Sequence, residues 1–175
     1  MRLALTLRLL QTPRHPVILC ASLVDEISDL VGLARTCEVF NVGGLIVPNL
    51  CVCEEDETFA TISATANKWM LMEQMRPENG ELAAVMLAWK RHGFTIVAVE
   101  QTTSSVCLSS YAFPEKVVIV LGKEKEGIPA DILQLVDVCI EIPHFGHIRS
   151  LGVEVSGSLL LWTCTQQRLA RDSTQ

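Results

Sequence analysis

The chain has 175 residues, of which 49% are hydrophobic and 19% charged, and its formal net charge is −6 at pH 7. This length is typical of one domain with a substantial core, and no apolar run reaches the length of a membrane-spanning helix. The acidic balance argues against tight, sequence-independent binding of nucleic acid, although a local basic patch can still contact phosphates. The mean hydropathy of +0.34 is high for a monomer of this size, so we expect a partner to cover some apolar surface.

The N-terminal segment contains Arg2, Arg8 and Arg14, and no acidic residue precedes Asp25. This composition is typical of a mitochondrial presequence, but the segment is short and poor in serine. We interpret residues 1–15 as a helical lead-in or as the cut edge of a longer protein. Residues 1–175 are then a single domain.

Hydrophobic periodicity and turn residues predict the helices and strands. In chain order they are the strand Val17–Ala21, the helix Ser28–Phe40, the strand Gly43–Val47, the helix Glu54–Ala66, a short strand Trp69–Met72, the helix Glu78–His92, the strands Phe94–Val99 and Val117–Leu121, the short helix Ala130–Leu135, the strand Val138–Ile142 and a helix from Ser150 to about Arg168. Cys51–Asp56 and Thr102–Glu115 are expected to be long polar loops.

This alternation of strands and helices predicts an α/β domain with a mostly parallel sheet. The strands are continuous apolar runs, which is typical of a sheet covered by helices on both faces. Sheets of this kind bind ligands at the carboxyl ends of their strands, here residues 100–103, 121–127 and 142–149. No dinucleotide-binding fingerprint and no phosphate-binding loop is present in the sequence, which disfavours a site for a dinucleotide or a nucleoside triphosphate.

Cysteine usage and histidine spacing bear on compartment and metal binding. The seven cysteines are odd in number and scattered through apolar stretches, which predicts free thiols in a reducing compartment. We expect a cytoplasmic protein, with the nucleus and the mitochondrion as alternatives. Cys51 and Cys53 lack a second pair, and no acid or thiol completes a ligand set for His144 and His147, so we expect no metal site.

Three polar side chains of the sequence have more than one explanation. Arg35 lies on a mostly apolar helix, so its guanidinium must reach solvent or pair with an anion such as an RNA phosphate. On chemistry alone, Glu124 between Lys123 and Lys125 favours a solvated turn, and Ser150 favours an N-cap. No histidine stands beside a serine or cysteine as a nucleophile–base pair would require.

Three segments nevertheless resemble, in the expected order, the signature motifs of the SpoU (TrmH-like) branch of the SPOUT RNA ribose methyltransferases. They are Asp29–Thr36, Val120–Pro129 and Glu141–Gly157. The resemblance extends from Val17 to about Arg168. It is strongest to the C-terminal catalytic domain of the eukaryotic TAR-RNA-binding-protein type of tRNA methyltransferase, which makes this chain a fragment or homologue of a longer protein.

The resemblance implies a C-terminal deep trefoil knot that binds S-adenosylmethionine and a homodimer with its site at the subunit interface. The implied reaction is methyl transfer to a ribose 2′-hydroxyl of tRNA, on a guanosine of the D-loop. Matching the motifs residue by residue assigns cofactor contacts to Gly122, Ile142 and Leu151 and catalytic roles to Arg35, Glu124 and Ser150. Because a free guanidinium gives up its proton only far above neutral pH, we assign Arg35 a positioning role rather than that of a base.

Departures from the family pattern keep a second function open. Where the family has asparagine, this chain has Asp29, Lys123 and Gly152, and it has Val31 and Glu154 where the family has small residues. The first hypothesis is an active tRNA 2′-O-methyltransferase, and the alternative is a knotted RNA-binding or dimerisation module with weak or lost catalysis. A small-molecule enzyme on a doubly wound sheet is a third, fold-level possibility, for which the sequence contains no cofactor motif.

Overall fold

The computed structural model describes residues 13–173, apart from the side chains of residues 58, 60, 67 and 79. The described strands form one sheet of seven, in the order β3-β2-β1-β6-β4-β7-β5, and every neighbouring pair is parallel. The strands are β1 (His15–Cys20), β2 (Val42–Val47), β3 (Met72–Gln74), β4 (Thr95–Val99), β5 (Val106–Cys107), β6 (Val117–Val120) and β7 (Val138–Glu141). The predicted α/β class with a mostly parallel sheet is confirmed.

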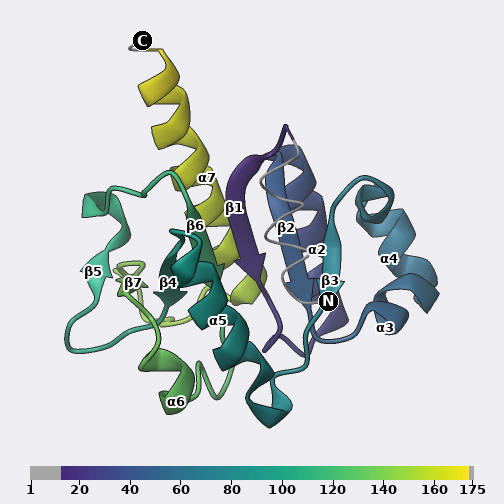
Figure 1. Cartoon of the computed structure of the whole chain (residues 1–175), viewed down its shortest axis with the longest axis horizontal. Helices are drawn as coiled ribbons and strands as arrows, with labels where there is room; N and C mark the ends of the chain where they lie inside the picture. Colours follow the sequence, from purple (N-terminus) through teal and green to yellow (C-terminus); the bar gives the residue numbers. More distant parts are fainter. Residues whose placement is uncertain (1–12, 174–175) are drawn as a thin grey trace.

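Helices cover both faces of this sheet (Figure 1). The α-helices are α2 (Ile27–Val39), α3 (Leu50–Glu55), α4 (Glu57–Ile62), α5 (Glu81–Arg91), α6 (Ala130–Leu133) and α7 (Val153–Asp172), with short 3-10 turns η1 (Ala66–Lys68), η2 (Glu78–Gly80) and η3 (Leu108–Ser110). Successive side chains of a strand point to opposite faces, so β1 supplies two cores. Val17 and Leu19 belong to the core under α2 and α7, whereas Ile18 and Cys20 belong to the core under α5 and α6.

The segment between β2 and β3 differs from the prediction. Instead of a polar loop at 51–56 followed by one helix, it contains two short helices. The side chain of Asn49 accepts hydrogen bonds from the backbone N of Cys51 and Val52 and starts α3 early. Asp56 interrupts the helix, and its Oδ1 accepts a hydrogen bond from the N of Phe59 at 3.0 Å, which starts α4. Two polar capping residues, Asn49 and Asp56, therefore set the helix boundaries that the apolar periodicity did not predict.

Two edge strands also differ from the prediction. The strand predicted at Trp69–Met72 begins only at Met72, because the backbone N atoms of Trp69 and Met70 bond back to the carbonyl of Ala66 in a helical turn. The predicted loop at 102–115 contains β5, whose Val106 pairs with Ile140 of β7. The other predicted elements lie close to their observed positions.

Candidate functional site

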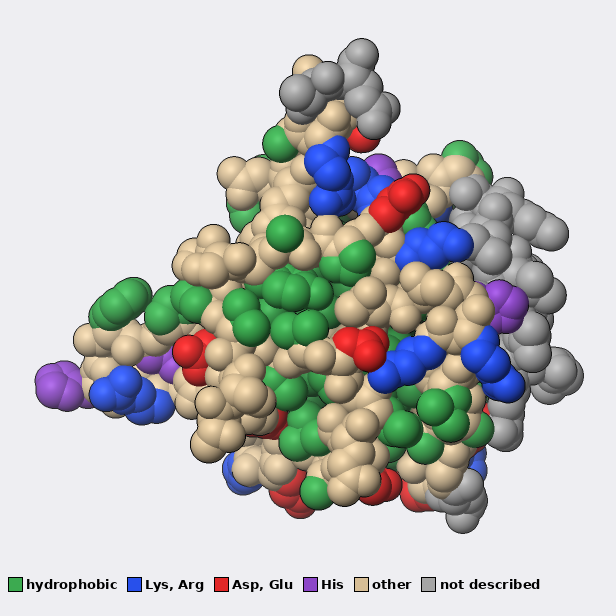
Figure 2. Space-filling view, turned by 60° about the vertical axis from the view of Figure 1, so that its left-hand side comes forward, with side chains coloured by type: hydrophobic (Ala, Val, Ile, Leu, Met, Phe, Trp, Pro, Cys, Tyr) green, Lys and Arg blue, Asp and Glu red, His purple; other side chains and the backbone are tan. Residues whose placement is uncertain are grey.

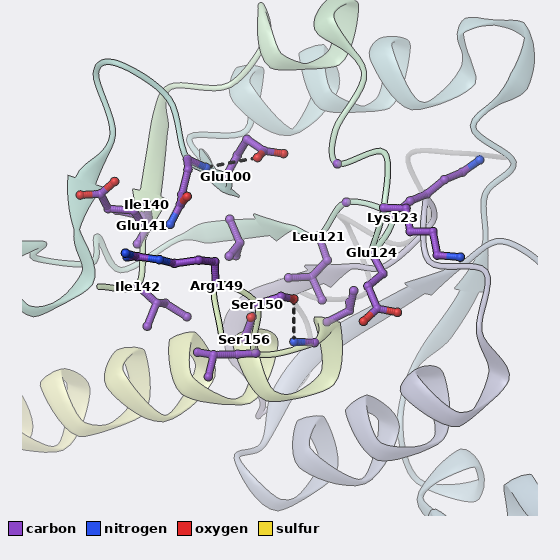
Figure 3. Close-up of a pocket in the computed structure, with 18 of the residues that line it drawn as sticks. Glu100, Leu121, Lys123, Glu124, Ile140, Glu141, Ile142, Arg149, Ser150 and Ser156 are labelled. Carbon is purple, nitrogen blue, oxygen red and sulfur yellow. Dashed lines mark hydrogen bonds between the residues drawn. The ribbon is translucent and has the colours of Figure 1, made fainter. Parts of the chain in front are cut away.

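A cavity of about 340 Å³ lies at the carboxyl ends of β4, β6 and β7, at the start of α7 (Figure 3). β6 and β7 flank β4 in the sheet, so the loops that follow these strands meet at one edge. The cavity is lined by Val99, Glu100, Gln101, Leu121, Gly122, Lys123, Glu124, Lys125, Glu126, Gly127, Ile140, Glu141, Ile142, His144, Arg149, Ser150, Leu151, Gly152, Val153 and Ser156. The structure therefore has a cavity at the strand ends where the sequence predicts a ligand site.

The turn after β6 is closed by its own backbone. Lys123 and Gly127 exchange two backbone hydrogen bonds, of 3.1 and 3.0 Å. A side chain at Gly122 would place its Cβ 2.6 Å from the carbonyl carbon of Gly127, and backbone cannot move aside as a side chain can. Gly127 itself has a φ of +69°, a conformation that favours glycine. The pair of glycines fixes a tight turn that presents backbone groups to the cavity.

Glu100, the residue after β4, holds this turn from the neighbouring strand. Its Oε2 accepts a hydrogen bond from the N of Ile128 at 3.1 Å, and its Oε1 accepts one from the N of Gln101 at 3.2 Å. Its carboxylate also closes over the α carbon of Gly127, where an added Cβ would lie 2.5 Å from Oε2. Glu100 was not among the residues predicted for the site, although its position directly after a predicted strand could have indicated it.

The loop between β7 and α7 forms the opposite wall. Nη1 of Arg149 donates to the carbonyl of His144 at 3.3 Å, and the hydroxyl of Ser150 accepts from the N of Gly152 at 3.3 Å. Gly152 has a φ of +77° and precedes the first helical residue, Val153. The helix therefore begins later than the predicted Ser150, and Ser150 is not its N-cap. The hydroxyl instead lies at the cavity.

Of the six residues predicted from the motifs, five line the cavity and one does not. Gly122, Glu124, Ile142, Ser150 and Leu151 are among the lining residues. Arg35 is not: it lies exposed on α2 and makes no hydrogen bond or ion pair with the described part of the chain. The fold alone thus gathers the second and third motifs but leaves the first-motif arginine outside.

The helix that carries Arg35 packs along α7 through three matched pairs. Gly32 lies under the carboxylate of Glu154, where a side chain at position 32 would overlap it. The hydroxyls of Thr36 and Ser158 are 3.2 Å apart, and the rings of Phe40 and Trp162 lie 5.7 Å apart between centroids. In each successive pair, the residue number rises by four on both helices, so the two helices run parallel. Arg35 lies beside this helix–helix contact.

Acidic groups lie together near the start of α2. Burial raises the pKa of Asp29 above its ordinary range, and the charges of Glu124, Glu26 and Asp25 raise it further. Glu124 of the cavity and Asp29 of α2 therefore repel each other. A hydrogen bond and ion pair with Glu126, at 3.0 Å, raise the pKa of the Lys123 ammonium.

The described residues contain no group of three or more His, Cys, Asp or Glu side chains arranged to hold a metal ion. All seven cysteines are free, as predicted. Within residues 13–173, no helix has both the length and the hydropathy needed to cross a membrane.

Comparisons with known proteins identify the family. A sequence profile described as "SpoU rRNA Methylase family" matches residues 17–162. The tRNA (guanosine(18)-2′-O)-methyltransferase TARBP1 of Mus musculus is 46% identical over 153 residues, which are 87% of this chain and 10% of that protein. The corresponding enzyme of Saccharomyces cerevisiae is 36% identical over 157 residues, 89% of this chain and 11% of that protein. The chain thus spans about a tenth of the length of these relatives.

A solved structure shares the fold. The A. aeolicus TrmH/SpoU tRNA modifying enzyme superposes with a TM-score of 0.77 at 24% identity, covering 97% of this chain and 86% of that one. Since the family profile matches well over half of the residues, the chain belongs to the SpoU rRNA Methylase family.

Proposed function

We propose that this chain is the catalytic domain of an S-adenosylmethionine-dependent tRNA 2′-O-methyltransferase that acts on guanosine 18, the residue named for its mouse relative. The observation that carries the proposal is the convergence of Gly122, Ile142, Ser150 and Leu151 on one cavity. These positions come from two separate motifs, and they share one pocket with a tight glycine turn.

The residues present fit the proposed cofactor. The cavity volume of about 340 Å³ lies within the range of pockets for small molecules and cofactors. Gly122 brings backbone close to the space, and Ile142 and Leu151 contribute apolar surface beside backbone amides. When bound, S-adenosylmethionine supplies a methyl group activated by its sulfonium. The role of this chain is then to hold the adenosyl part, exclude water and align the acceptor hydroxyl.

The three proposed catalytic side chains act by position and charge. The Arg35 guanidinium holds an RNA phosphate through hydrogen bonds and charge, and it orients the ribose hydroxyl rather than removing its proton. Ser150 presents a hydroxyl at the cavity, and Glu124 presents a carboxylate at its mouth. These groups can accept or relay hydrogen bonds from the ribose.

A homodimer would complete the site. Arg35 does not line the cavity of its own chain, and the exposed side of α7 has an apolar stripe formed by Val155, Leu159, Trp162 and Leu169. These residues recur at helical spacing, which is typical of a helix that packs on a partner. Val39, exposed on α2 near Arg35, continues the apolar surface. Pairing through this surface would carry Arg35 of each subunit to its partner's cavity.

Charge distribution bears on how the tRNA is held. On the face shown in Figure 2, the basic side chains of the described residues lie singly or in small groups among acidic ones. This distribution and the net charge of −6 indicate that the chain alone binds tRNA weakly. Arg35 and Arg149 would make local phosphate contacts, and other parts of a longer protein would supply most of the affinity for tRNA. The free thiols support a location in the reducing cytoplasm.

A methyl-transfer assay tests the proposal. The chain is incubated with S-adenosylmethionine labelled in the methyl group and with a tRNA transcript, and a second transcript has a 2′-deoxyguanosine at position 18. We expect label on the first RNA alone, strongly reduced by Arg35→Ala. Arg91→Ala, an exposed arginine on α5 at the opposite face of the sheet, is the matched control and should retain full activity.

The alternative function is a non-catalytic module, and Asp29 is the observation that favours it. Its charge faces Glu124 at the mouth of the cavity, where an RNA phosphate would have to approach. Binding of tRNA or of the cofactor with no transfer of label to either RNA would establish that alternative and reject the first.

A further inference from the structure

His144 presents a buried polar atom that the fold leaves without a partner. The side chain lines the cavity, and its Nε2 atom is buried and makes no hydrogen bond with the described residues. Nearly all buried polar atoms in proteins have a partner, and an exception beside a cavity calls for a ligand that supplies one. His144 belongs to no catalytic or cofactor position derived from the family motifs.

The other ring nitrogen shows what kind of partner Nε2 needs. Nε2 of Gln101 lies 3.4 Å from Nδ1 of His144. An amide nitrogen only donates, so Nδ1 of a neutral imidazole accepts, and the ring proton then sits on Nε2. The orphaned Nε2 is therefore a donor, and the described part of the chain supplies no acceptor for it.

A contact also holds the backbone of this residue. The backbone carbonyl of His144 accepts a hydrogen bond from Arg149 at 3.3 Å. Gln101 is adjacent to Glu100, which is bonded to Ile128 of the glycine turn. A chain of contacts thus connects the turn after β6, the end of β4 and the loop after β7, with His144 at the cavity wall.

We propose that His144 is a cofactor-binding residue whose Nε2–H donates a hydrogen bond to an acceptor atom of the adenosine part of S-adenosylmethionine. The inference rests on the proposed function, because it takes the cavity as the cofactor site. His144 lines the same cavity as Ile142 and Leu151, the proposed cofactor contacts, so a cofactor held there lies within its reach. Adenine nitrogens and ribose oxygens both offer acceptors there.

Calorimetric titration with S-adenosylhomocysteine tests the proposal. His144→Phe keeps a flat ring but removes the donor, so we expect binding about tenfold weaker, the usual effect of one lost hydrogen bond. His144→Gln restores a donor and should recover part of the affinity. The matched control is His147→Phe, which alters an exposed histidine of the same loop outside the cavity lining and should leave binding unchanged.

A second ligand, 5′-methylthioadenosine, locates the acceptor because it lacks the amino-acid part. The same loss for His144→Phe with both ligands supports a contact to adenosine. A loss seen only with S-adenosylhomocysteine contradicts it. If the parent chain binds neither compound, the proposed function fails together with this inference. If the parent binds and His144→Phe binds equally well, only the inference fails.

Nitrogen-15 spectra of the imidazoles test the same point without a substitution. We expect the neutral ring of His144 to carry its proton on Nε2 and the Nε2 signal to move when S-adenosylhomocysteine is added. A proton on Nδ1, or a signal unaffected by saturating ligand, would overturn the proposal even if a variant failed to fold.

Discussion

The carboxylate of Glu100 joins the end of β4 to the far side of the glycine turn, where its Oε2 accepts a hydrogen bond from the N of Ile128 at 3.1 Å. Ile128 is buried, so its amide has no ready replacement partner in water. Through this one side chain, the end of β4 is connected to the turn that follows β6, and both line the cavity. The geometry of the cavity therefore depends on a residue outside the family motifs.

Replacing Glu100 should loosen this wall. Glu100→Ala leaves the amide of Ile128 without an acceptor, and we expect the free energy of unfolding to fall by about 1–3 kcal/mol. Urea denaturation measures the loss. Glu126→Ala is the control, because it removes only the surface ion pair with Lys123 and should leave the stability nearly unchanged. Equal stability of the two variants would refute the role given to Glu100.

Two glycines, one in the turn after β6 and one in the loop after β7, should respond differently to an added methyl group. In Gly122→Ala the new Cβ would meet the backbone of Gly127, and we expect a loss of about 1–3 kcal/mol from overpacking. In Gly146→Ala nothing lies within 4 Å of the new atom, so little change is expected. Thermal unfolding of the two variants checks this, and identical melting temperatures would count against the described turn.

Asp29 should make stability depend on pH. Its carboxyl is less easily ionised in the folded chain, because burial and then Glu124, Glu26 and Asp25 raise its pKa above the ordinary 3.8. A raised acid pKa means that ionisation costs folding free energy. The cost is absent below pH 3.8, grows as the pH rises through the folded pKa and is constant above it.

Asp29→Asn removes that cost. We therefore expect the variant to be more stable than the parent at neutral pH, by less than about 1 kcal/mol since the group is partly exposed. The advantage should disappear in acid. Chemical denaturation at several pH values measures it, and an advantage that is the same at every pH would show that charge is not its source.

Subunit mixing tests whether Arg35 acts on the partner's cavity. Arg35→Ala and Glu124→Ala should each be inactive alone. If the arginine acts across the interface, a mixed dimer contains one cavity with an intact Glu124 that receives an intact Arg35. Equal mixing should then restore about a quarter of the parent activity. No recovery, with dimer exchange verified by mass spectrometry, would mean that Arg35 serves its own subunit.

Two cysteines that are neighbours in sequence should differ in reactivity. Cys51 is exposed, whereas burial, with help from Glu54 and Asp56, raises the pKa of Cys53 to about 11. Since the thiolate is the reactive form, iodoacetamide at neutral pH should modify Cys51 first in the native chain. Peptide mass spectrometry identifies the modified residue. Equal labelling before unfolding would contradict the helix that buries Cys53.

Patterns that depend on burial were predictable from the sequence. The runs at 17–21, 43–47 and 117–121 are apolar because their strands lie between two helical layers. A continuous apolar run can be recognised from a few consecutive residues of the sequence. The site could be placed at strand ends for the same reason, because parallel strands deliver their loops to one edge.

Features set by single polar contacts or by distant pairing were not predictable. Asn49 and Asp56 divide one expected helix into two, and β5 is too short to leave a periodic signal. The place of Ser150 depends on the backbone of Gly152, which periodicity does not report. Glu154 departs from the family pattern, and its side chain fits only because Gly32 on α2 has no side chain. The trefoil knot and the roles of the site residues stay predictions.

The central claim is that the cavity at the ends of β4, β6 and β7 binds the methyl donor. Calorimetric titration of the chain with S-adenosylmethionine, repeated with Gly122→Ala and with Gly146→Ala, tests it most directly. We predict saturable binding by the parent and by Gly146→Ala and a severe loss of affinity in Gly122→Ala. An absence of binding by the parent, or equal affinity in a folded Gly122→Ala, would contradict the claim.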